Sequence, residues 1–583
     1  MARLPGYLVG LNRFDYLLAV SLVLLIAVYS SLFVNFATIP FEDAAILMRY
    51  SQHLAQGHGI VWNVGGKPVD GATDFLPMVL FAGLKSAGMS LENAVHFVTV
   101  SAHVLSVVFV YLAIRELYGS SRWVAWISAG FLAIGPGLSL SQGYFATPAF
   151  ALFCCVAWYL ANKLLAEPNS HTKALMFALA SLTLGLIRPE GVFLAVFFLL
   201  GILCVKGWRQ TRLVSVYFCA IFAFLGGLYF LWRWTYFGYP LPNPFYKKGG
   251  GHIYFDSLKQ SIENAVELTF PFALAFIYPI VLLVLLLVRR LLQLISLGPS
   301  ATDDNLGYDV ATVAKRTIFP LIPIVGFTTI WLLLSNEMNF YGRFQYVVVP
   351  IILMSWPSLL VDYRKYQGSP RMNDLDRKLR AVLTFLIVLG LIPVLAYSLH
   401  RQTEINHADK DGRYEVAVML SSYDHGYTMA VTEAGLLPLY SGWKAIDTWG
   451  LNDQWIAHHG EITESYLGRF KPEVIMVHED PNSPLEGWTS MVAVVKHYAA
   501  KNNYILAAEY GNDPHDVHLY YVRRGFPDSI EMAERICKID YVFRDVLAQG
   551  QTINYATNYA LRKPHSSRLG RCSPSSPGRG VGG

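Results

Sequence analysis

Residues 15–36 read DYLLAVSLVLLIAVYSSLFVNF, and residues 381–399 read AVLTFLIVLGLIPVLAYSL. Each run is long and apolar enough to cross about 30 Å of hydrocarbon as a helix. Further runs of this kind lie between them, near 92–114, 123–139, 144–162, 174–188, 191–205, 213–234, 267–288, 318–335 and 346–361. The sequence therefore predicts a polytopic α-helical membrane protein with about eleven transmembrane helices.

The composition of the 583 residues excludes an ordinary water-soluble protein. Hydrophobic residues make up 54% and charged residues 15% of the chain, whereas soluble domains carry about 25% charged residues. The mean hydropathy is +0.37, so the polar residues are too few to cover a soluble surface. The net charge of +5 is small and spread over short loops. Nucleic acid is therefore not an expected partner.

The distribution of Lys and Arg predicts the orientation of the chain. Segments on the side of the N-terminus carry nineteen of these residues, and the opposite loops carry eight. By the positive-inside rule the N-terminus lies in the cytoplasm, and an odd number of spans puts the residues after 400 outside. The apolar stretch 75–89 is short, and a span there would invert every later loop. We expect it to form a re-entrant or interfacial helix.

The chain changes character near residue 400. Short strand-like runs at 473–477, 504–508 and 518–522 alternate with helical segments at 489–500 and 529–546, which indicates a small α/β domain. We therefore expect a membrane module at 1–400 with a first extracytoplasmic loop at 37–91, an extracytoplasmic α/β domain at 401–560 and a disordered tail at 561–583. Cys537 and Cys572 could pair, although their spacing does not require it.

The first loop is too rich in polar residues for a simple connector. It reads IPFEDAAILMRYSQHLAQGHGIVWNVGGKPVDGATDF from Ile39 to Phe75. Ile46, Tyr50 and Leu54 predict an amphipathic helix along the interface that Gly57 ends. Acids at a helix N-terminus are stabilising in themselves, but a carboxylate here could also be a general base beside a lipid-borne substrate. The candidate residues of this loop are Glu42 and Asp43 as catalytic carboxylates, and His58, Asn63, Asp70 and Asp74 for substrate binding.

Three further loops on the same face carry cations. They are the turn Arg188-Pro189-Glu190-Gly191, the loop 242–248 with Lys247 and Lys248, and the aromatic-rich loop 336–344. A snorkelling arginine paired with its own glutamate would explain the first, and a solvated basic loop the second. Arginine donates bidentately to phosphate, which favours a phosphate contact. The candidate donor-binding residues are Arg343, Lys247, Arg188 and Glu190.

The first loop has the pattern E-D-A-x-I-x-x-R-Y, followed by G-x-G-x-V-W-N-x-G and V-D-G-x-T-x-F-L, between Glu42 and Leu76. Further matching elements lie at 188–191, 242–248, 343–344 and 434–453. On these motifs the chain resembles the GT-C membrane glycosyltransferases, and among them the actinobacterial terminal arabinofuranosyltransferases and their bacterial relatives. It departs from that pattern at Glu42, His53, Asp70 and Pro77, which weakens any inference about the same sugar.

The resemblance implies transfer of a sugar from a polyprenyl-phosphate donor to a cell-envelope glycan or glycolipid outside a bacterial cytoplasmic membrane. It puts the catalytic carboxylate in the acidic pair, with Asp43 as the first choice and Glu42 as the second. Inversion at the anomeric carbon is expected for a single displacement. A divalent cation is compatible with this chemistry, but the sequence shows no clear ligand set for one.

Two other classes of function remain open at this point. A lipid-glycan transporter or flippase would also be polytopic, although transporters usually show repeated halves and ionisable groups near the midplane. A non-catalytic scaffold that displays an extracytoplasmic domain would leave the acidic first loop unexplained. Turnover of a polyprenyl-phosphate sugar would distinguish the three.

Overall fold

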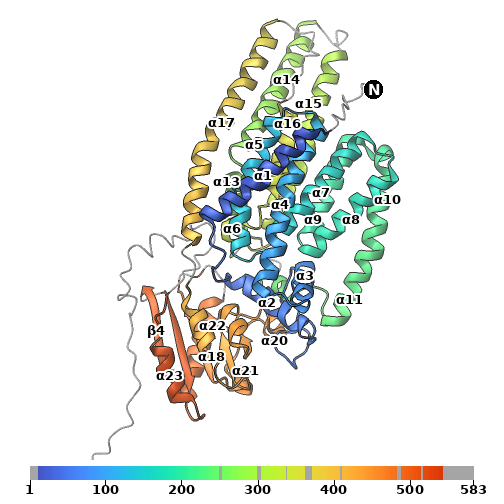
Figure 1. The fold of residues 1–583 in the computed structure, drawn as a ribbon. Helices are drawn as coiled ribbons and strands as arrows, with labels where there is room; N and C mark the ends of the chain where they lie inside the picture. The colour runs from blue at the N-terminus through green and yellow to red at the C-terminus, as the bar shows by residue number, and fades with distance from the viewer. Residues whose placement is uncertain are drawn as a thin grey trace, which may run out of the picture.

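The computed structural model describes residues 11–248, 253–297, 304–336, 338–360, 370–406, 410–481, 483, 487–513 and 516–542. The predicted tail at 561–583 lies outside these residues. The chain forms a bundle of helices with an α/β domain packed against one end, and the N-terminal end lies at the opposite end of the bundle (Figure 1). The α/β domain and the N-terminal end thus lie at opposite ends of the long axis of the bundle.

Seven helices of the described chain are long and apolar enough to cross a membrane. An eighth candidate is a broken pair, α13 (Phe255–Thr269) followed by η2 (Phe272–Phe276) and α14 (Ile277–Leu297), bent by 96°. The seven comprise α1 (Arg13–Phe33), α4 (Leu91–Tyr118), α5 with α6 (Arg122–Ala133, Pro136–Gln142), α7 (Thr147–Ala166), α10 with η1 and α11 (Trp208–Ile221, Phe222–Gly226, Gly227–Phe237), α15 (Asp304–Thr329) and α17 (Pro370–Asn406).

By length and composition, the described chain has fewer candidate spans than the eleven expected. All eleven apolar runs contain helix, but three of the helices have only 12 to 17 residues: α8 (His171–Ile187), α9 (Gly191–Lys206) and α16 (Val348–Leu359). In α16 nearly every residue is buried, so its apolar side chains pack in the interior of the bundle. An apolar run alone does not distinguish such a core helix from a lipid-facing one.

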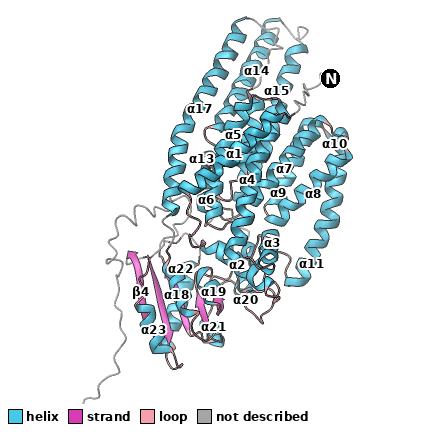
Figure 2. Cartoon of the chain, in the orientation of Figure 1, coloured by secondary structure: helices cyan, strands magenta, loops and turns pink. Residues whose placement is uncertain are grey.

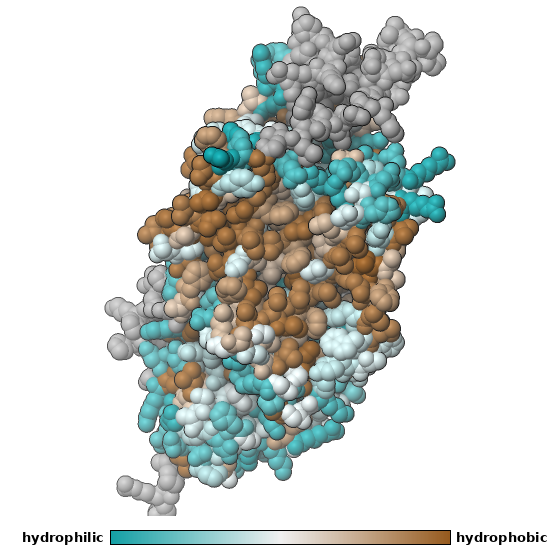
Figure 3. Space-filling view, turned by 45° about the vertical axis from the view of Figure 1, so that its right-hand side comes forward, coloured by the Kyte–Doolittle hydropathy of each residue, from teal (hydrophilic) through white to brown (hydrophobic). Residues whose placement is uncertain are grey.

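A belt of apolar side chains surrounds the bundle on the face shown in Figure 3, between hydrophilic surfaces at both ends. Large side chains such as Leu24 of α1, Phe224 of η1 and Ile392 of α17 are 60%, 67% and 67% exposed. Soluble monomers rarely expose so large an apolar surface. The prediction of a polytopic helical membrane protein is confirmed.

All named strands of the described chain lie in the C-terminal domain (Figure 2). They are β1 (Thr428–Val431), β2 (Lys444–Asp447), β3 (Val474–Glu479), β4 (Tyr504–Asp513) and β5 (Asp516–Arg523), in the order β2-β1-β3-β5-β4. Strand β1 pairs in parallel with β2 and β3, whereas β5 pairs antiparallel with β3 and β4.

The sheet is accompanied by α18 (Gly412–Leu420), α19 (Leu436–Ser441), α20 (Gln454–His459), α21 (Glu464–Phe470), α22 (Trp488–Lys501) and α23 (Ser529–Cys537). The predicted α/β domain is confirmed, with β3, β4, β5 and α22 where the sequence placed them. The helix predicted for 529–546 is wrong in its extent, because α23 ends at Cys537. Strands β1 and β2 were missed because each has only four residues.

The first loop lies between the bundle and the α/β domain (Figure 1) and contains α2 (Glu42–Ala55) and α3 (Phe75–Ser86). The helix α2 was predicted, but its burial was not: Met48, Arg49 and Tyr50 are all buried. It is covered on one side by the bundle and on the other by the domain. Gly57, at φ +82°, allows the chain to turn away after α2. With 12 residues, α3 is too short to span.

Candidate functional site

Asp43 and Arg343 form an ion pair between the first loop and the membrane bundle. Asp43 is the second residue of α2, and Arg343 follows the short 3₁₀ helix η4 (Phe340–Gly342). Arg343 Nη2 lies 2.5 Å from Asp43 Oδ2. The guanidinium is 4.4 Å from the ring centroid of Phe145 and 4.8 Å from that of Phe344. Aromatic rings thus hold the arginine in position while it faces the carboxylate.

The charges around Asp43 determine its protonation. Burial by itself would raise the pKa of this carboxyl group, but the cations Arg343 and Lys248 outweigh it and lower the pKa below the usual value. Asp43 is therefore ionised at neutral pH, and its proton affinity depends on these neighbouring cations.

A second group of charges lies beside this pair. Arg188 Nη2 is 2.9 Å from Glu190 Oε1, and its Nη1 is 3.8 Å from Asp74 Oδ1. Arg188 lies 5.1 Å from the ring of Phe344, the same ring that Arg343 contacts. Burial raises the pKa of Asp74, which Arg188 only partly offsets. The structure thus brings five of the candidate residues together: Asp43, Asp74, Arg188, Glu190 and Arg343.

Asp43 lies in the wall of a pocket between the bundle, the first loop and the α/β domain. Its lining includes Asp43, Lys248 of α12 (Asn243–Lys248), Phe340, Trp449 and Glu433. We call this the Asp43 pocket. It combines a carboxylate, a cation and aromatic faces, which suits a sugar joined to an anionic group.

Glu42 lines the same pocket, but other groups engage its carboxylate. Its Oε2 accepts a hydrogen bond from the backbone N–H of Leu436 at 3.0 Å, and its Oε1 lies 3.3 Å from Arg413 Nη1. A Cβ atom at Gly435 would lie 2.0 Å from Glu42 Oε2, so only glycine fits there. Burial raises the pKa of Glu42 to about 7 although Arg413 opposes this. Through these contacts, Glu42 joins α2 to the α/β domain.

The side chains of two candidate residues form hydrogen bonds with the α/β domain. Lys247 Nζ donates to the carbonyl of Gly460 at 2.8 Å and lies 4.5 Å from the ring of Trp449. The Asn63 side chain both accepts from the N–H and donates to the carbonyl of Ala445, each at 2.9 Å. These side chains join the membrane module to the domain and do not face Asp43.

The two remaining candidates also lie apart from the Asp43–Arg343 pair. Asp70 is buried and receives two hydrogen bonds of 2.7 Å from Arg233 of α11. His58 is exposed, with its ring 6.3 Å from that of His53. Asp70 therefore fastens the first loop to α11, and His58 has the surroundings of a turn residue.

Sequence reasoning did not select three residues that now matter. Lys248 rather than Lys247 lines the Asp43 pocket. The sequence alone does not tell which of two adjacent lysines faces a pocket, because this depends on how α12 is turned. Arg233 interrupts an apolar run, a signal that predicts a buried partner. Arg413 left no signal in its local sequence, because its partners come from distant segments.

One further group was not predicted. Within the described ranges, Glu433, His478 and His518 are close enough to one another to hold a metal ion. The group lies in the α/β domain, and none of the candidate residues belongs to it.

A known family model matches part of the chain. Residues 400–524 match a family model described as Domain of unknown function DUF8728. Among curated protein sequences, none matches this chain significantly. The match to the family model covers the end of α17 and most of the α/β domain, and its description names no activity.

Solved membrane proteins are similar over most of the chain. ArnT from Cupriavidus metallidurans in the apo state is 12% identical with a TM-score of 0.48, covering 87% of this chain and 97% of that one. The same protein bound to undecaprenyl phosphate is 12% identical with a TM-score of 0.47. That match covers 88% of this chain and 98% of the other. The Archaeoglobus fulgidus oligosaccharyltransferase in complex with Zn and sulfate is 11% identical with a TM-score of 0.44, covering 87% and 72%.

Proposed function

We propose that this protein transfers a sugar from a polyprenyl-phosphate donor to a cell-envelope glycan or glycolipid. The observation that carries the proposal is the Asp43–Arg343 ion pair, whose carboxylate lies in the wall of a pocket that Lys248 also lines. A general base and an anion-binding cation in direct contact are the two groups that such a transfer requires. The first-loop resemblance makes polyprenyl-phosphate arabinofuranose the first donor to test.

The donor phosphate would bind at Arg343 in this mechanism. The planar guanidinium donates to phosphate oxygens, and Lys248 and Arg188 add positive charge nearby, since both act on Asp43 electrostatically. The lipid part would remain in the bilayer, where the apolar belt of the bundle lies (Figure 3). The donor would thus reach the pocket by lateral diffusion.

Donor binding would also prepare Asp43 to act as a base. In the free protein, the pKa of Asp43 is lowered by Arg343, which makes the carboxylate a weak base. When the donor phosphate binds Arg343, Asp43 loses its ion-pair partner. The proton affinity of Asp43 then rises. The acceptor oxygen then attacks the anomeric carbon, its proton passes to Asp43, and the bond from that carbon to the phosphate oxygen breaks. Polyprenyl phosphate leaves and the anomeric carbon is inverted.

A nucleotide-sugar donor has less support. The chain has two Asp-x-Asp strings, and in the second, at 409–411, Asp411 already pairs with Arg413 at 2.6 Å. The first is Asp374-Leu375-Asp376. The Asp374 carboxylate pairs with Arg377 at 2.7 Å and with Lys378 at 2.8 Å, and these side chains are well exposed. The string lies near the start of α17, at the end of the bundle remote from the α/β domain (Figure 1). It is therefore far from the Asp43 pocket.

We further propose the orientation that the charge count predicts. The N-terminus would lie in the cytoplasm of a bacterium, and the Asp43 pocket with the α/β domain would lie outside the cytoplasmic membrane. The separation of the N-terminal end and the domain along the bundle supports this arrangement (Figure 1).

The test uses the purified full-length protein with a panel of polyprenyl-phosphate sugars and a cell-envelope acceptor extract. Mass spectrometry would follow release of polyprenyl phosphate and extension of the acceptor, with the Asp43→Asn variant as the control. Donor-dependent release in the wild type alone is the expected result. Movement of intact donor across liposomes without release would indicate a flippase instead, and binding without either would indicate a scaffold.

A further inference from the structure

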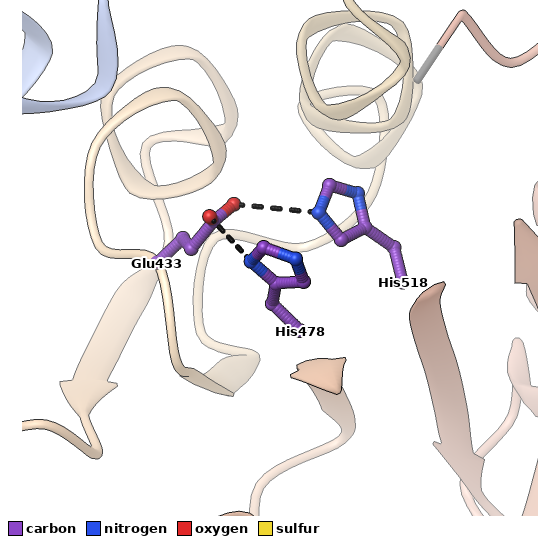
Figure 4. A group of neighbouring side chains, drawn as sticks. All are labelled: Glu433, His478 and His518. Atoms are coloured by element: carbon purple, nitrogen blue, oxygen red, sulfur yellow. Dashed lines mark hydrogen bonds and ion pairs between the residues drawn. The ribbon is translucent and has the colours of Figure 1, made fainter. Parts of the chain in front are cut away.

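Three ligand-type side chains converge at one end of the sheet in the α/β domain (Figure 4). Glu433 follows β1, while His478 on β3 and His518 on β5 lie directly opposite each other in the antiparallel register. Cross-strand partners of this kind project from the same face of a sheet. The three side chains thus come from β3, β5 and the segment that follows β1, and they point toward one another (Figure 4).

The polar atoms of the three side chains lie close enough together to bind one metal ion, and the contact between Glu433 and His478 is also of hydrogen-bond length. The ligand atoms all lie within 4.8 Å of one another. Glu433 Oε1 is 2.9 Å from His478 Nδ1, and Oε2 is 3.6 Å from His518 Nε2. A tetrahedral Zn²⁺ site with bonds of about 2.0–2.1 Å separates its ligand atoms by about 3.3–3.4 Å. The 3.6 Å separation is too long for a hydrogen bond but close to this value.

The outer contacts orient both imidazoles for such an ion. His478 Nε2 lies 2.8 Å from Asp516 Oδ1, and an ionised carboxylate only accepts, so this nitrogen carries a proton. His478 Nδ1 faces Glu433 Oε1 at 2.9 Å. His518 Nδ1 is 2.6 Å from the hydroxyl of Tyr541, and Nε2 faces Glu433. Carboxylate–histidine–metal arrangements of this form are usual around zinc.

Arg413 contacts the same glutamate and does not exclude an ion. Its Nη1 donates to Glu433 Oε2, and carboxylates that bind metals are themselves commonly hydrogen-bonded. Its charge is also compensated, because Nη2 lies 2.6 Å from Asp411 Oδ2 and Nη1 lies 3.3 Å from Glu42 Oε1. The guanidinium therefore fits the role of an outer contact of the site.

We propose that Glu433, His478 and His518 bind a divalent transition-metal ion of the zinc type, with an open fourth position for water. One carboxylate and two imidazoles are a ligand set that zinc accepts. The ion would fix the ends of β1, β3 and β5 and would hold Glu433 in place for Arg413 and, through it, Glu42 of α2. This proposal does not depend on the proposed glycosyl transfer.

The test measures metal content of the full-length protein, purified through a tag without histidines. The protein is stripped with EDTA, dialysed, equilibrated with Zn²⁺ and separated from free ion before mass-spectrometric analysis. One zinc ion per chain is expected in the wild type and in the control His425→Gln, whose histidine is exposed in the same domain. The variants His478→Gln and His518→Gln should lose it. Zinc retained by both variants, or absent from the wild type, overturns the proposal.

A second variant keeps the test decisive if those two fail to fold. Asp516→Asn leaves all three ligands in place, and its side chain is 32% exposed, so folding should tolerate it. Loss of an outer carboxylate should raise the dissociation constant for zinc about 10–100-fold. Substitution with Co²⁺ should give the intense visible absorption of a four-coordinate site in the wild type. An unchanged zinc affinity in Asp516→Asn, or no such absorption, counts against the site.

Discussion

Glu42 and Arg413 belong to different parts of the molecule, and they meet with 3.3 Å between Oε1 and Nη1, directly beside the residue that faces Arg343. Two adjacent acids at the start of α2 are thus divided between two tasks. Glu42 joins the helix to the α/β domain, and Asp43 remains available to a substrate. This division predicts different results for the same conservative change at the two positions.

Asp43→Asn should reduce turnover about 10²–10⁴-fold, because loss of a general base costs this much. Glu42→Gln should reduce it much less, because the amide oxygen can still accept from the N–H of Leu436. Both variants are compared by release of polyprenyl phosphate, with donor binding as the check on folding. A larger loss at Glu42 than at Asp43 would reverse the two assignments.

Arg413→Met should destabilise the α/β domain strongly. Arg413 is 1% exposed and pairs with Asp411, Glu433 and Glu42, so its loss leaves buried carboxylates without their cation. Removal of one partner from such a group costs about 3–5 kcal/mol. Thermal unfolding in detergent measures the effect. The matched control is Arg469→Met, an exposed arginine that lies over the ring of Tyr466, and a similar loss there would contradict the prediction.

Arg343→Gln should weaken donor binding and change the pH dependence of the remaining activity. Asp43 must be ionised to accept a proton, and its pKa is lowered by Arg343 and Lys248 against the effect of burial. The wild type should therefore keep its activity as the pH falls until it passes through this lowered pKa. Without Arg343, burial is less opposed, the pKa rises, and the acid limb of kcat/KM should move to higher pH.

The conservative variant Arg343→Lys serves as the control for that experiment. It keeps a positive charge near Asp43, so its acid limb should stay close to that of the wild type, while it loses the bidentate contact to phosphate. If the acid limb of Arg343→Gln also stays in place, another group controls the profile.

Asn63→Ala should lower stability by about 1–3 kcal/mol, because it leaves the buried N–H of Ala445 without its side-chain partner, whereas the carbonyl of Ala445 still accepts from Trp62 Nε1. His58→Ala is the matched control from the same loop, since His58 is exposed. Thermal unfolding should distinguish the two, and donor affinity should be unchanged in His58→Ala. A fall in donor affinity for His58→Ala alone would restore it as a substrate-binding residue.

The fold was largely predictable because its main signals are local. Apolar runs predicted α1, α4, α7 and α17, and the strand-like runs predicted β3 and β5, since both depend on residues that are close in sequence. Span length was less predictable, because α16 is as apolar as a lipid-facing helix yet lies inside the bundle. Burial of that kind depends on the neighbouring helices.

The candidate site was predictable only in part. The acids, Arg188 and Arg343 were selected because charge at a membrane edge is costly without a partner. Their pairing was not predictable, since 300 residues separate Asp43 from Arg343. Asn63 and Asp70 looked like substrate ligands, yet they have protein partners in β2 and α11. A polar side chain gives the same sequence signal for both kinds of partner.

The contact between α2 and the α/β domain also sets an order of events during synthesis. The bond from Leu436 to Glu42 joins residues 394 positions apart, and ribosomes add about 5–20 residues per second, so about 20–80 s pass between their appearances. Throughout that interval Arg49, which finally donates to the carbonyls of Pro438 and Trp443, has no such partner. The first loop is thus completed by residues made 394 positions later, and until they are made the Asp43 pocket lacks the wall that Asp447 and Trp449 supply.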